Sequence, residues 1–317
     1  MKKSYMEYIE LIDKMFSEKN YTKVLKFFTT DYKEYDITEF EVLWVRIWAL
    51  SGLNRVEEAI EKLHDLIVEK RYWVLEMITE EIEIDAIKRD DRYQKLMEIS
   101  EQNAKNFSYK KEGKYEIFTP KNTDENTKLL VFLHGNYLAT EEFSQIQKDT
   151  VNSIGSRLKG EFIVTIPYSS RIAPSGQSLW YDYGESSKEI EKHLRIIQDE
   201  YKIMPSNIII TGGSAGAGVA TEVALNNNIE VNKFALLIPH IPKLKNNDER
   251  ISNLRKSEFF IYSSTNDFCM KYANKFSEIL TQNNFKHVFH CPDGYGHFIP
   301  PEENLLDRTI KYFKFSV

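Results

Sequence analysis

From about residue 115 onward, the sequence alternates short apolar runs with amphipathic segments, and this alternation restricts the chain to few folds. The apolar runs lie at 115–120, 129–133, 161–167, 207–211, 234–239, 258–263 and 286–290. Segments with helical periodicity lie at 186–202, 215–226, 268–283 and 302–313. Strands that are apolar throughout are buried on both faces, and connecting helices make such strands parallel. We therefore predict an α/β fold: a mostly parallel sheet flanked by helices, with its ligand beyond the carboxyl ends of the strands.

Residues 1–105 follow a different pattern. They contain no proline and one glycine, Gly52, and their apolar residues recur at steps of three and four. One such series is Tyr8, Leu11, Ile12 and Met15. This period is typical of amphipathic helices. Because the helical rhythm stops near residue 105, we predict an all-α helical domain over 1–105 and a second domain over 106–317.

The helical part also contains a weak internal repeat. Segment 17–28 resembles segment 51–63, with Asn20 and Asn54 34 residues apart. At a spacing of 35, Val24, Leu25 and Phe28 match Ala59, Ile60 and Leu63. A helix–turn–helix unit of this period resembles a tetratricopeptide repeat. A plain helical bundle is the alternative, and both interpretations stay open. The carboxylates of this part are expected to lie on solvated helix faces.

Composition excludes several classes of protein. In 317 residues, 42% are hydrophobic and 28% are charged, which is typical of a globular protein, and a net charge of −6 argues against nucleic acid as a partner. No signal peptide and no membrane span are recognisable, so we predict a cytoplasmic protein. The two cysteines, Cys269 and Cys291, are too few for a disulfide scaffold and too far apart for a zinc pair. We expect neither a cofactor nor a metal.

A G-x-S-x-G pattern, Gly212 to Gly216, stands directly between the predicted strand 207–211 and the predicted helix 215–226. In this context the pattern predicts a nucleophile elbow, a sharp turn that presents Ser214 above the sheet. Gly212 and Gly216 would provide clearance where strand and helix close on each other. A phosphate-binding loop is the rival interpretation, but no G-x-x-x-x-G-K-[ST] is present and a dinucleotide fingerprint belongs to the first strand–helix turn.

A serine nucleophile needs a general base and a group that orients that base. Of seven histidines, His297 lies in a Gly/Pro loop just past the last strand, whereas His240 after strand 234–239 is a weaker competitor. The acid should fall between serine and histidine in chain order. Asp267 follows strand 258–263 and is our candidate. The first alternative for the acid is Asp293, which lies in the same loop as His297, and the second is Asp248.

An oxyanion formed at such a serine needs hydrogen-bond donors. We predict that the backbone N–H of Ala215, next to the nucleophile, supplies one. The turn His134-Gly135-Asn136 follows strand 129–133, and Gly135 lets the backbone bend there, which nominates the N–H of Asn136 as the second donor.

The loop 167–184 is rich in aromatic residues close to the same strand ends. Its side chains offer a candidate substrate pocket, with an arginine for an anionic group: Tyr168, Arg171, Trp180 and Tyr181. The alternative is a loop that its own aromatic residues pack down.

The segment from about residue 107 to 317 resembles the α/β-hydrolases. The resemblance is carried by the H-G turn at 134–135, the predicted elbow at 212–216, Asp267 and His297. It is most similar to serine esterases of the phospholipase/carboxylesterase or feruloyl-esterase kind. It departs from the H-G-G-G signature of some relatives, because Asn136 follows the H-G pair. The resemblance implies hydrolysis of a carboxylic ester or thioester of a small molecule through an acyl-enzyme.

The sequence leaves two alternative functions open. A serine peptidase uses the same triad on amides. A scaffold or binding protein would instead recruit a partner through residues 1–105, which could also mediate a homodimer. The sequence has a candidate residue for every catalytic role, and this argues against a scaffold protein that has lost catalysis.

Overall fold

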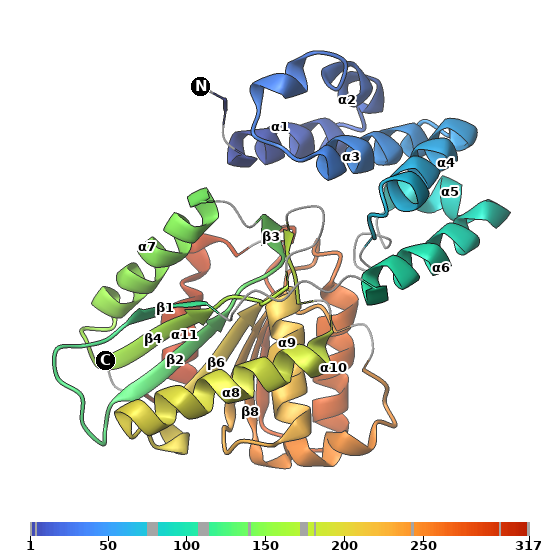
Figure 1. Cartoon of the computed structure of the whole chain (residues 1–317). Coiled ribbons are helices and arrows are strands. Elements are labelled where there is room, and N and C mark those ends of the chain that lie inside the picture. The colour runs from blue at the N-terminus through green and yellow to red at the C-terminus, as the bar shows by residue number, and fades with distance from the viewer. Residues whose placement is uncertain are drawn as a thin grey trace. The chain divides into compact units, whose positions relative to one another are not determined.

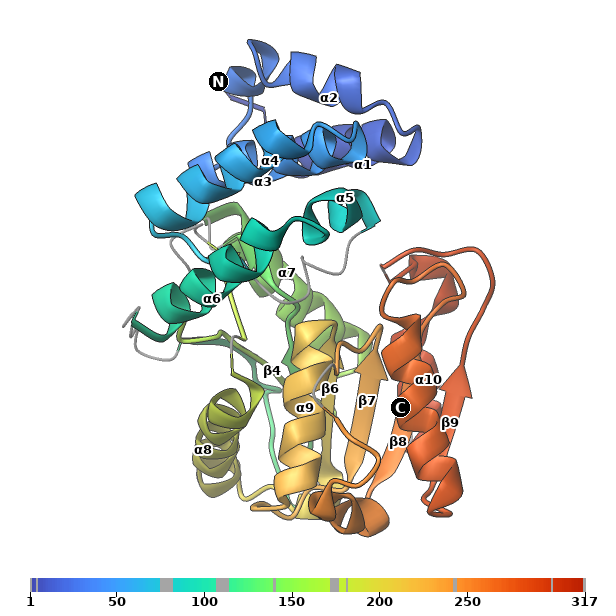
Figure 2. The same ribbon diagram turned by 90° about the vertical axis from the view of Figure 1, so that its right-hand side faces the viewer.

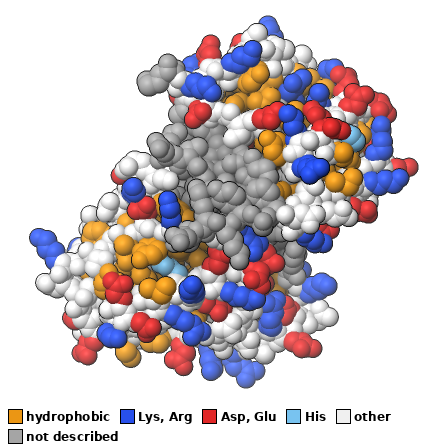
Figure 3. Space-filling model, in the orientation of Figure 1, with side chains coloured by type: hydrophobic (Ala, Val, Ile, Leu, Met, Phe, Trp, Pro, Cys, Tyr) orange, Lys and Arg blue, Asp and Glu red, His pale blue; other side chains and the backbone are white. Residues whose placement is uncertain are grey.

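The computed structural model describes residues 2–3, 5–74, 82–106, 114–138, 141–171, 177–180, 182–241, 244–297 and 299–315. These residues form two compact units: those up to Asn106 make up the helical unit, and those from Lys114 onward make up the sheet unit. Acidic and basic side chains are interspersed on the face shown in Figure 3. Within the described ranges, none of the helices combines the length and the apolar character that a membrane span requires.

The helical unit consists of α-helices and shorter helical turns (Figure 1). Its α-helices are α1 (Tyr5–Ser17), α2 (Tyr21–Phe27), α3 (Glu39–Gly52), α4 (Val56–His64), α5 (Asp85–Lys88) and α6 (Asp91–Asn106). Shorter helical turns are η1 (Asp31–Glu34), η2 (Asp65–Glu69) and η4 (Ile82–Ile84). One apolar cluster joins α1, α2 and α3 around Tyr8, and another joins α3, α4 and α6 around Ile47. The predicted boundary after residue 105 adjoins the end of α6, and residues 107–113 lie outside the described ranges.

Two helical hairpins, α1–α2 and α3–α4, have equivalent turns. After α1, Lys19 has a φ of 52° and the N–H of Asn20 donates to the Met15 carbonyl. After α3, Asn54 has a φ of 59° and the N–H of Arg55 donates to the Leu50 carbonyl. In both turns, a residue in the left-handed (αL) conformation and the hydrogen bond after it form a C-cap that ends the α-helix. Lys19 therefore corresponds to Asn54, which gives the two hairpins a spacing of 35 residues. The alignment of Asn20 with Asn54, at a spacing of 34, is displaced by one residue from this correspondence.

The sheet unit contains a seven-stranded sheet, which Figures 1 and 2 show from two sides. In sheet order its strands are β1 (Tyr115–Phe118), β4 (Phe162–Pro167), β2 (Lys128–Leu133), β6 (Ile208–Gly213), β7 (Lys233–Leu237), β8 (Glu258–Tyr262) and β9 (His287–His290). All neighbouring strands are parallel except β1, which pairs antiparallel with β4. A separate antiparallel pair joins β3 (Tyr137–Leu138) to β5 (Gln177–Ser178). The prediction of a mostly parallel sheet is confirmed.

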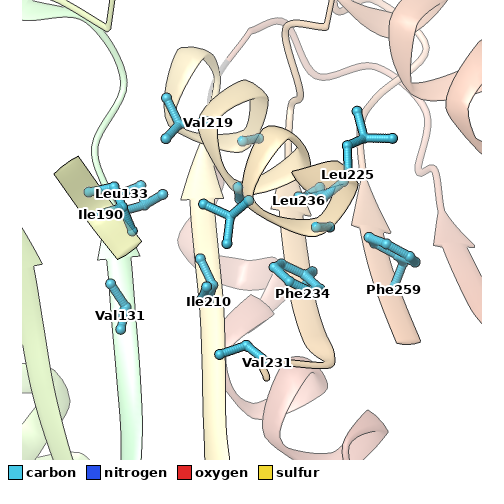
Figure 4. Packing of buried hydrophobic residues seen from close by; sticks show 14 of the residues in the cluster. Val131, Leu133, Ile190, Ile210, Val219, Leu225, Val231, Phe234, Leu236 and Phe259 are labelled. Carbon is cyan, nitrogen blue, oxygen red and sulfur yellow. The ribbon is translucent and has the colours of Figure 1, made fainter. Parts of the chain in front are cut away.

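Helices cover both faces of the sheet (Figure 1). They are α7 (Glu141–Arg157), α8 (Tyr183–Tyr201), α9 (Ala215–Asn226), α10 (Met270–Gln282) and α11 (Leu305–Tyr312), with the short turns η5 (Pro205–Asn207), η6 (Glu249–Lys256) and η7 (Pro301–Glu303). Val131 and Ile210 point to the face covered by α8, α9 and α10 (Figure 4). Leu130 and Ile209 belong to the opposite cluster, with α7 and α11. Burial on both faces explains why these strands are continuous apolar runs.

Every predicted strand is present, with ends that differ by at most two residues. Helix α7 was not predicted. It contains Gly155, where a Cβ atom would lie 2.2 Å from the ring of Phe118 on β1. Glycine weakens the helical signal of the sequence. It is required here because the helix packs directly on the edge strand.

Candidate active site

Ser214 occupies a sharp turn between β6 and α9. Its backbone has a φ of 52° and a ψ of −119°, a conformation that is rare for a residue with a side chain and is unfavourable by roughly 1–3 kcal/mol. Neighbouring backbone holds it in place: its N–H donates to the Leu237 carbonyl at 2.9 Å, and its own carbonyl accepts from the Ala217 N–H at 3.0 Å. The strained turn therefore lies at the junction of β6 and α9, where the sequence predicts a nucleophile elbow.

The glycines around Ser214 differ in what surrounds them. A Cβ atom on Gly212 would lie 2.4 Å from the Gly216 carbonyl carbon, and one on Gly216 would lie 2.3 Å from the Leu133 oxygen. A Cβ atom on Gly213 would meet Ile299 only at 3.8 Å, which is ordinary contact. The strand–helix crossing therefore excludes side chains at Gly212 and Gly216 but not at Gly213.

The structure brings Ser214, His297 and Asp267 together. His297 Nε2 lies 2.9 Å from the hydroxyl oxygen of Ser214, and His297 Nδ1 lies 2.7 Å from Asp267 Oδ1. Ser214 comes from the end of β6, Asp267 follows β8, and His297 follows β9. Three strand ends thus contribute to one hydrogen-bonded chain, as expected for a parallel sheet.

The side chain of Asp267 is fully buried, and both of its carboxylate oxygens accept hydrogen bonds. Oδ2 accepts from the Ser263 hydroxyl at 2.8 Å, and Oδ1 accepts from the Cys269 backbone N–H at 2.8 Å as well as from His297. Burial of an ion is tolerated when such bonds replace water. Ser263 was not predicted from the sequence, although its place directly after a buried strand indicates it.

The loops after β8 and β9 are joined by further hydrogen bonds. The Ser264 hydroxyl donates to the Tyr295 carbonyl at 2.5 Å, and the Gly294 N–H donates to the Thr265 hydroxyl at 3.1 Å. The Thr265 N–H donates to the Pro292 carbonyl at 3.2 Å. These bonds connect the loop that carries the acid with the loop that carries the histidine. They also were not foreseen from the sequence.

The competing residues are placed elsewhere. Asp293 is exposed, and Asp248 caps η6 and pairs with Arg250 at 2.8 Å. The ring of His240 is buried against Tyr183, whose hydroxyl lies 2.6 Å from Nδ1. Other histidines contact partners away from Ser214: His193 with Thr165, His287 with Ser277, and His290 with Glu303.

The turn His134-Gly135-Asn136 lies beside Ser214, because a Cβ atom on Gly135 would be 3.4 Å from the Ser214 Cβ. The turn is braced from behind. Trp180 Nε1 donates to the His134 carbonyl at 2.7 Å, and the two rings stack with centroids 4.7 Å apart. The Asn136 side-chain oxygen accepts from the Trp180 N–H at 3.3 Å.

His134 is fully enclosed, and burial lowers its pKa to about 4, although the bond to Gly135 acts in the opposite direction. Its Nε2 accepts from the Ser169 N–H at 3.0 Å, and its Nδ1 lies 2.5 Å from the Gly135 carbonyl. An acceptor at Nε2 leaves the proton on Nδ1. His134 is therefore a neutral brace of the turn over the ordinary pH range.

Solved structures share this architecture. An uncharacterized protein from Bacillus cereus ATCC 10987 covers 98% of this chain and 100% of its own, with 19% identity and a TM-score of 0.53. A ferulic acid esterase covers 63% of this chain and 91% of its own, with 18% identity and a TM-score of 0.50. No protein-family model and no curated protein matches the chain. The sheet unit has the α/β-hydrolase fold. The match to the Bacillus cereus protein extends over both units.

In this α/β-hydrolase fold, one predicted oxyanion donor begins helix α9 and the other follows strand β2. Ala215 is the buried first residue of α9, so its N–H belongs to the unpaired, electropositive end of the helix. Asn136 precedes β3, directly after the turn that adjoins Ser214.

The predicted pocket residues lie in different surroundings. Tyr168 donates through its hydroxyl to Glu116 on β1 at 3.2 Å. Arg171 is half-buried and bonds through its backbone to Ser169 and Leu179. Trp180 is 2% exposed and supports the H-G-N turn, which agrees with the alternative of a loop packed by its own aromatic residues. Tyr181 lies outside the described residues.

Metal-ligating groups also meet at this site. Asp267, Cys269 and His297 offer ligand atoms within 4.8 Å of one another. However, Asp267 and His297 are joined directly by a hydrogen bond at 2.7 Å, so a metal ion would have to replace the proton between them. The same two side chains also bond to Ser214 and Ser263, so both are already engaged in hydrogen bonds within the protein.

Proposed function

We propose that the protein is a serine hydrolase that cleaves a carboxylic ester or thioester of a small molecule through an acyl-enzyme on Ser214. The observation that carries this proposal is the unbroken chain of hydrogen bonds from Ser214 through His297 to Asp267, with distances of 2.9 and 2.7 Å. That a structure of similar fold is named a ferulic acid esterase supports an ester as substrate.

The acylation step follows from this chain. As the Ser214 oxygen bonds to the substrate carbonyl carbon, its proton passes to His297 Nε2. Asp267 stays ionised and holds the Nδ1–H, which keeps Nε2 free to accept. The negative charge that develops on the carbonyl oxygen is stabilised by the N–H groups of Ala215 and Asn136. Collapse of the tetrahedral intermediate breaks the bond to the alcohol or thiol, which takes the proton from Nε2.

Deacylation repeats the sequence with water. His297 Nε2 accepts a proton from water as the water oxygen attacks the acyl carbon, and then returns a proton to the Ser214 oxygen as the acid leaves. His297 therefore acts in both steps, whereas the leaving alcohol is present only in the first.

A fluorophosphonate probe, which reacts with an activated serine, tests the proposal. We expect labelling of the wild-type protein and none of Ser214→Ala. Failure to label a folded wild-type protein would refute the function. An ester-versus-amide panel with a common acyl group separates esterase from peptidase, and faster cleavage of the amides would overturn the assignment as an esterase.

The identity of the acid is tested by two variants. Asp267→Asn should lower kcat about 10³-fold or more, because the imidazole loses the partner that fixes its tautomer. Asp293→Asn, in an exposed position of the loop that carries His297, serves as the matched control and should keep kcat within about twofold. Equal losses in both variants would contradict the role given to Asp267.

We also propose that residues 1–105 form a tetratricopeptide-like helical domain. The equivalent turns at Lys19 and Asn54 support this, since their spacing of 35 residues is close to the period of that repeat.

A further inference from the structure

An exposed phenylalanine stands against the candidate general base. Phe268 directly follows Asp267, and its ring centroid lies 4.3 Å from that of His297, with the planes inclined by 38°. Phenylalanine is usually buried, yet Phe268 is 37% exposed. The side chain of His297 is itself 18% exposed. The two rings therefore touch each other and both retain surface toward solvent.

The chemistry of acylation requires the leaving group to approach this pair of rings. His297 Nε2 must come within about 3.2 Å of the leaving oxygen to protonate it. The carbon attached to that oxygen is then only one bond further away. The ring of Phe268, centred 4.3 Å from the imidazole, is near enough to His297 for the group that this carbon carries to reach it.

We propose that Phe268 forms the apolar wall of the leaving-group subsite and favours esters whose alcohol carries an aromatic, flat group next to the ester oxygen. This inference rests on the proposed function. Its physical basis is the burial of the exposed ring face by the substrate, with an offset or edge-to-face arrangement of the two aromatic groups. A flat group fits because the ring of Phe268 cannot move far while it packs on His297.

A purely structural role makes a different prediction. If Phe268 only held the imidazole in place, its removal would slow every step that uses His297, whatever the leaving group. Because the alcohol has departed before deacylation, a leaving-group contact affects acylation alone. The two roles are therefore separable by kinetics.

The test compares benzyl butyrate with ethyl butyrate, which share one acyl group and have alcohols of similar basicity. For Phe268→Ala we expect the ratio of kcat/KM, benzyl over ethyl, to fall about threefold to tenfold relative to wild type. Phe268→Tyr keeps the ring and should keep the ratio. Deacylation, measured as the slow phase after a p-nitrophenyl butyrate burst, should stay within about twofold of wild type in both variants.

Tyr115 offers a matched control. It is 42% exposed, and its ring lies 4.6 Å from that of His193, a histidine outside the candidate site. Tyr115→Ala removes an equally exposed aromatic side chain from a histidine and should leave the ratio unchanged. A drop in Tyr115→Ala as large as in Phe268→Ala would overturn the proposal.

An unchanged ratio in Phe268→Ala would also overturn it, as would a parallel loss in both esters and in deacylation. If Phe268→Ala does not fold, Phe268→Leu provides the same comparison. Fluorophosphonate labelling keeps the two levels of inference apart. A wild-type protein that does not label refutes the function itself, whereas normal labelling with an unchanged ratio refutes only the role of Phe268.

Discussion

Among single residues, Gly213 and Gly216 flank Ser214 from opposite sides but face different neighbours. A side chain on Gly216 would collide with backbone oxygens of Leu133 and His134, which cannot move without disrupting β2. Gly213 meets nothing closer than Ile299 at 3.8 Å. This difference agrees with the G-x-S-x-G pattern, in which Gly216 stands at a position fixed as glycine and Gly213 stands at a variable position.

We therefore predict opposite effects for two alanine substitutions. Gly213→Ala should retain fluorophosphonate labelling and should be neutral or raise the free energy of unfolding by about 0.4–1 kcal/mol, because alanine restricts the unfolded chain. Gly216→Ala should abolish labelling or the folded state. Labelling and urea unfolding of both variants measure this, and a labelled, stable Gly216→Ala would contradict the steric argument.

The sequence indicated Ser214, Asp267 and His297, which the structure joins by hydrogen bonds, better than the residues that hold them. Asp267 and His297 could be proposed because each lies in the loop that follows a strand of a parallel sheet. The bonds of Asp267 to Ser263 and of Ser264 to Tyr295 connect two loops, and their pairing depends on how those loops bend. Trp180 was assigned to a pocket because its loop lies near the strand ends, but its burial beneath His134 depends on tertiary packing.

For secondary-structure elements, a continuous apolar run was decisive where burial was uniform. Strands β4 and β6 are buried along their whole length, and their apolar runs marked them clearly. The pair β3–β5 has two residues in each strand, which is too short for any period to show. Antiparallel pairing of β1 was also not foreseen, since strand direction is set by the connection and not by the residues of the strand.

The contact between helix α8 and strand β4 includes a buried histidine. His193 on α8 pairs through Nε2 with the Thr165 hydroxyl at 3.1 Å. Burial lowers the pKa of His193 to about 4. As pH falls, the unfolded chain therefore binds a proton near its ordinary pKa of 6.5 while the folded chain stays neutral. The stabilising contribution is present above that pH and is lost as pH falls toward 4.

We predict that His193→Gln weakens the pH dependence of stability between pH 7 and pH 5. The wild-type free energy of unfolding should fall over this interval by about 2 kcal/mol more than that of the variant, because the variant cannot bind the extra proton in its unfolded state. Urea unfolding at both pH values measures the difference. Parallel curves for the two proteins would show that His193 is not buried in the neutral form.

For the whole molecule, each unit has hydrophobic clusters of its own. The clusters of the helical unit draw on α1 to α6, and those of the sheet unit draw on the two faces of its sheet. A unit with a separate core can unfold as a separate cooperative step. The tryptophans make such steps visible, because Trp44, Trp48 and Trp73 lie in the helical unit and Trp180 lies in the sheet unit.

We predict that a cavity in the helical unit leaves the sheet unit folded. Ile47 is fully buried in the cluster of α3, α4 and α6, so Ile47→Ala should destabilise that unit by about 2–5 kcal/mol. Tryptophan fluorescence, dominated by the helical unit, should show its main transition at lower urea than in wild type. Fluorophosphonate labelling of Ser214 should persist to the same urea concentration in both proteins. If both transitions shift together, the two units unfold as one, and the hydrolase fold then depends on the helices for its stability.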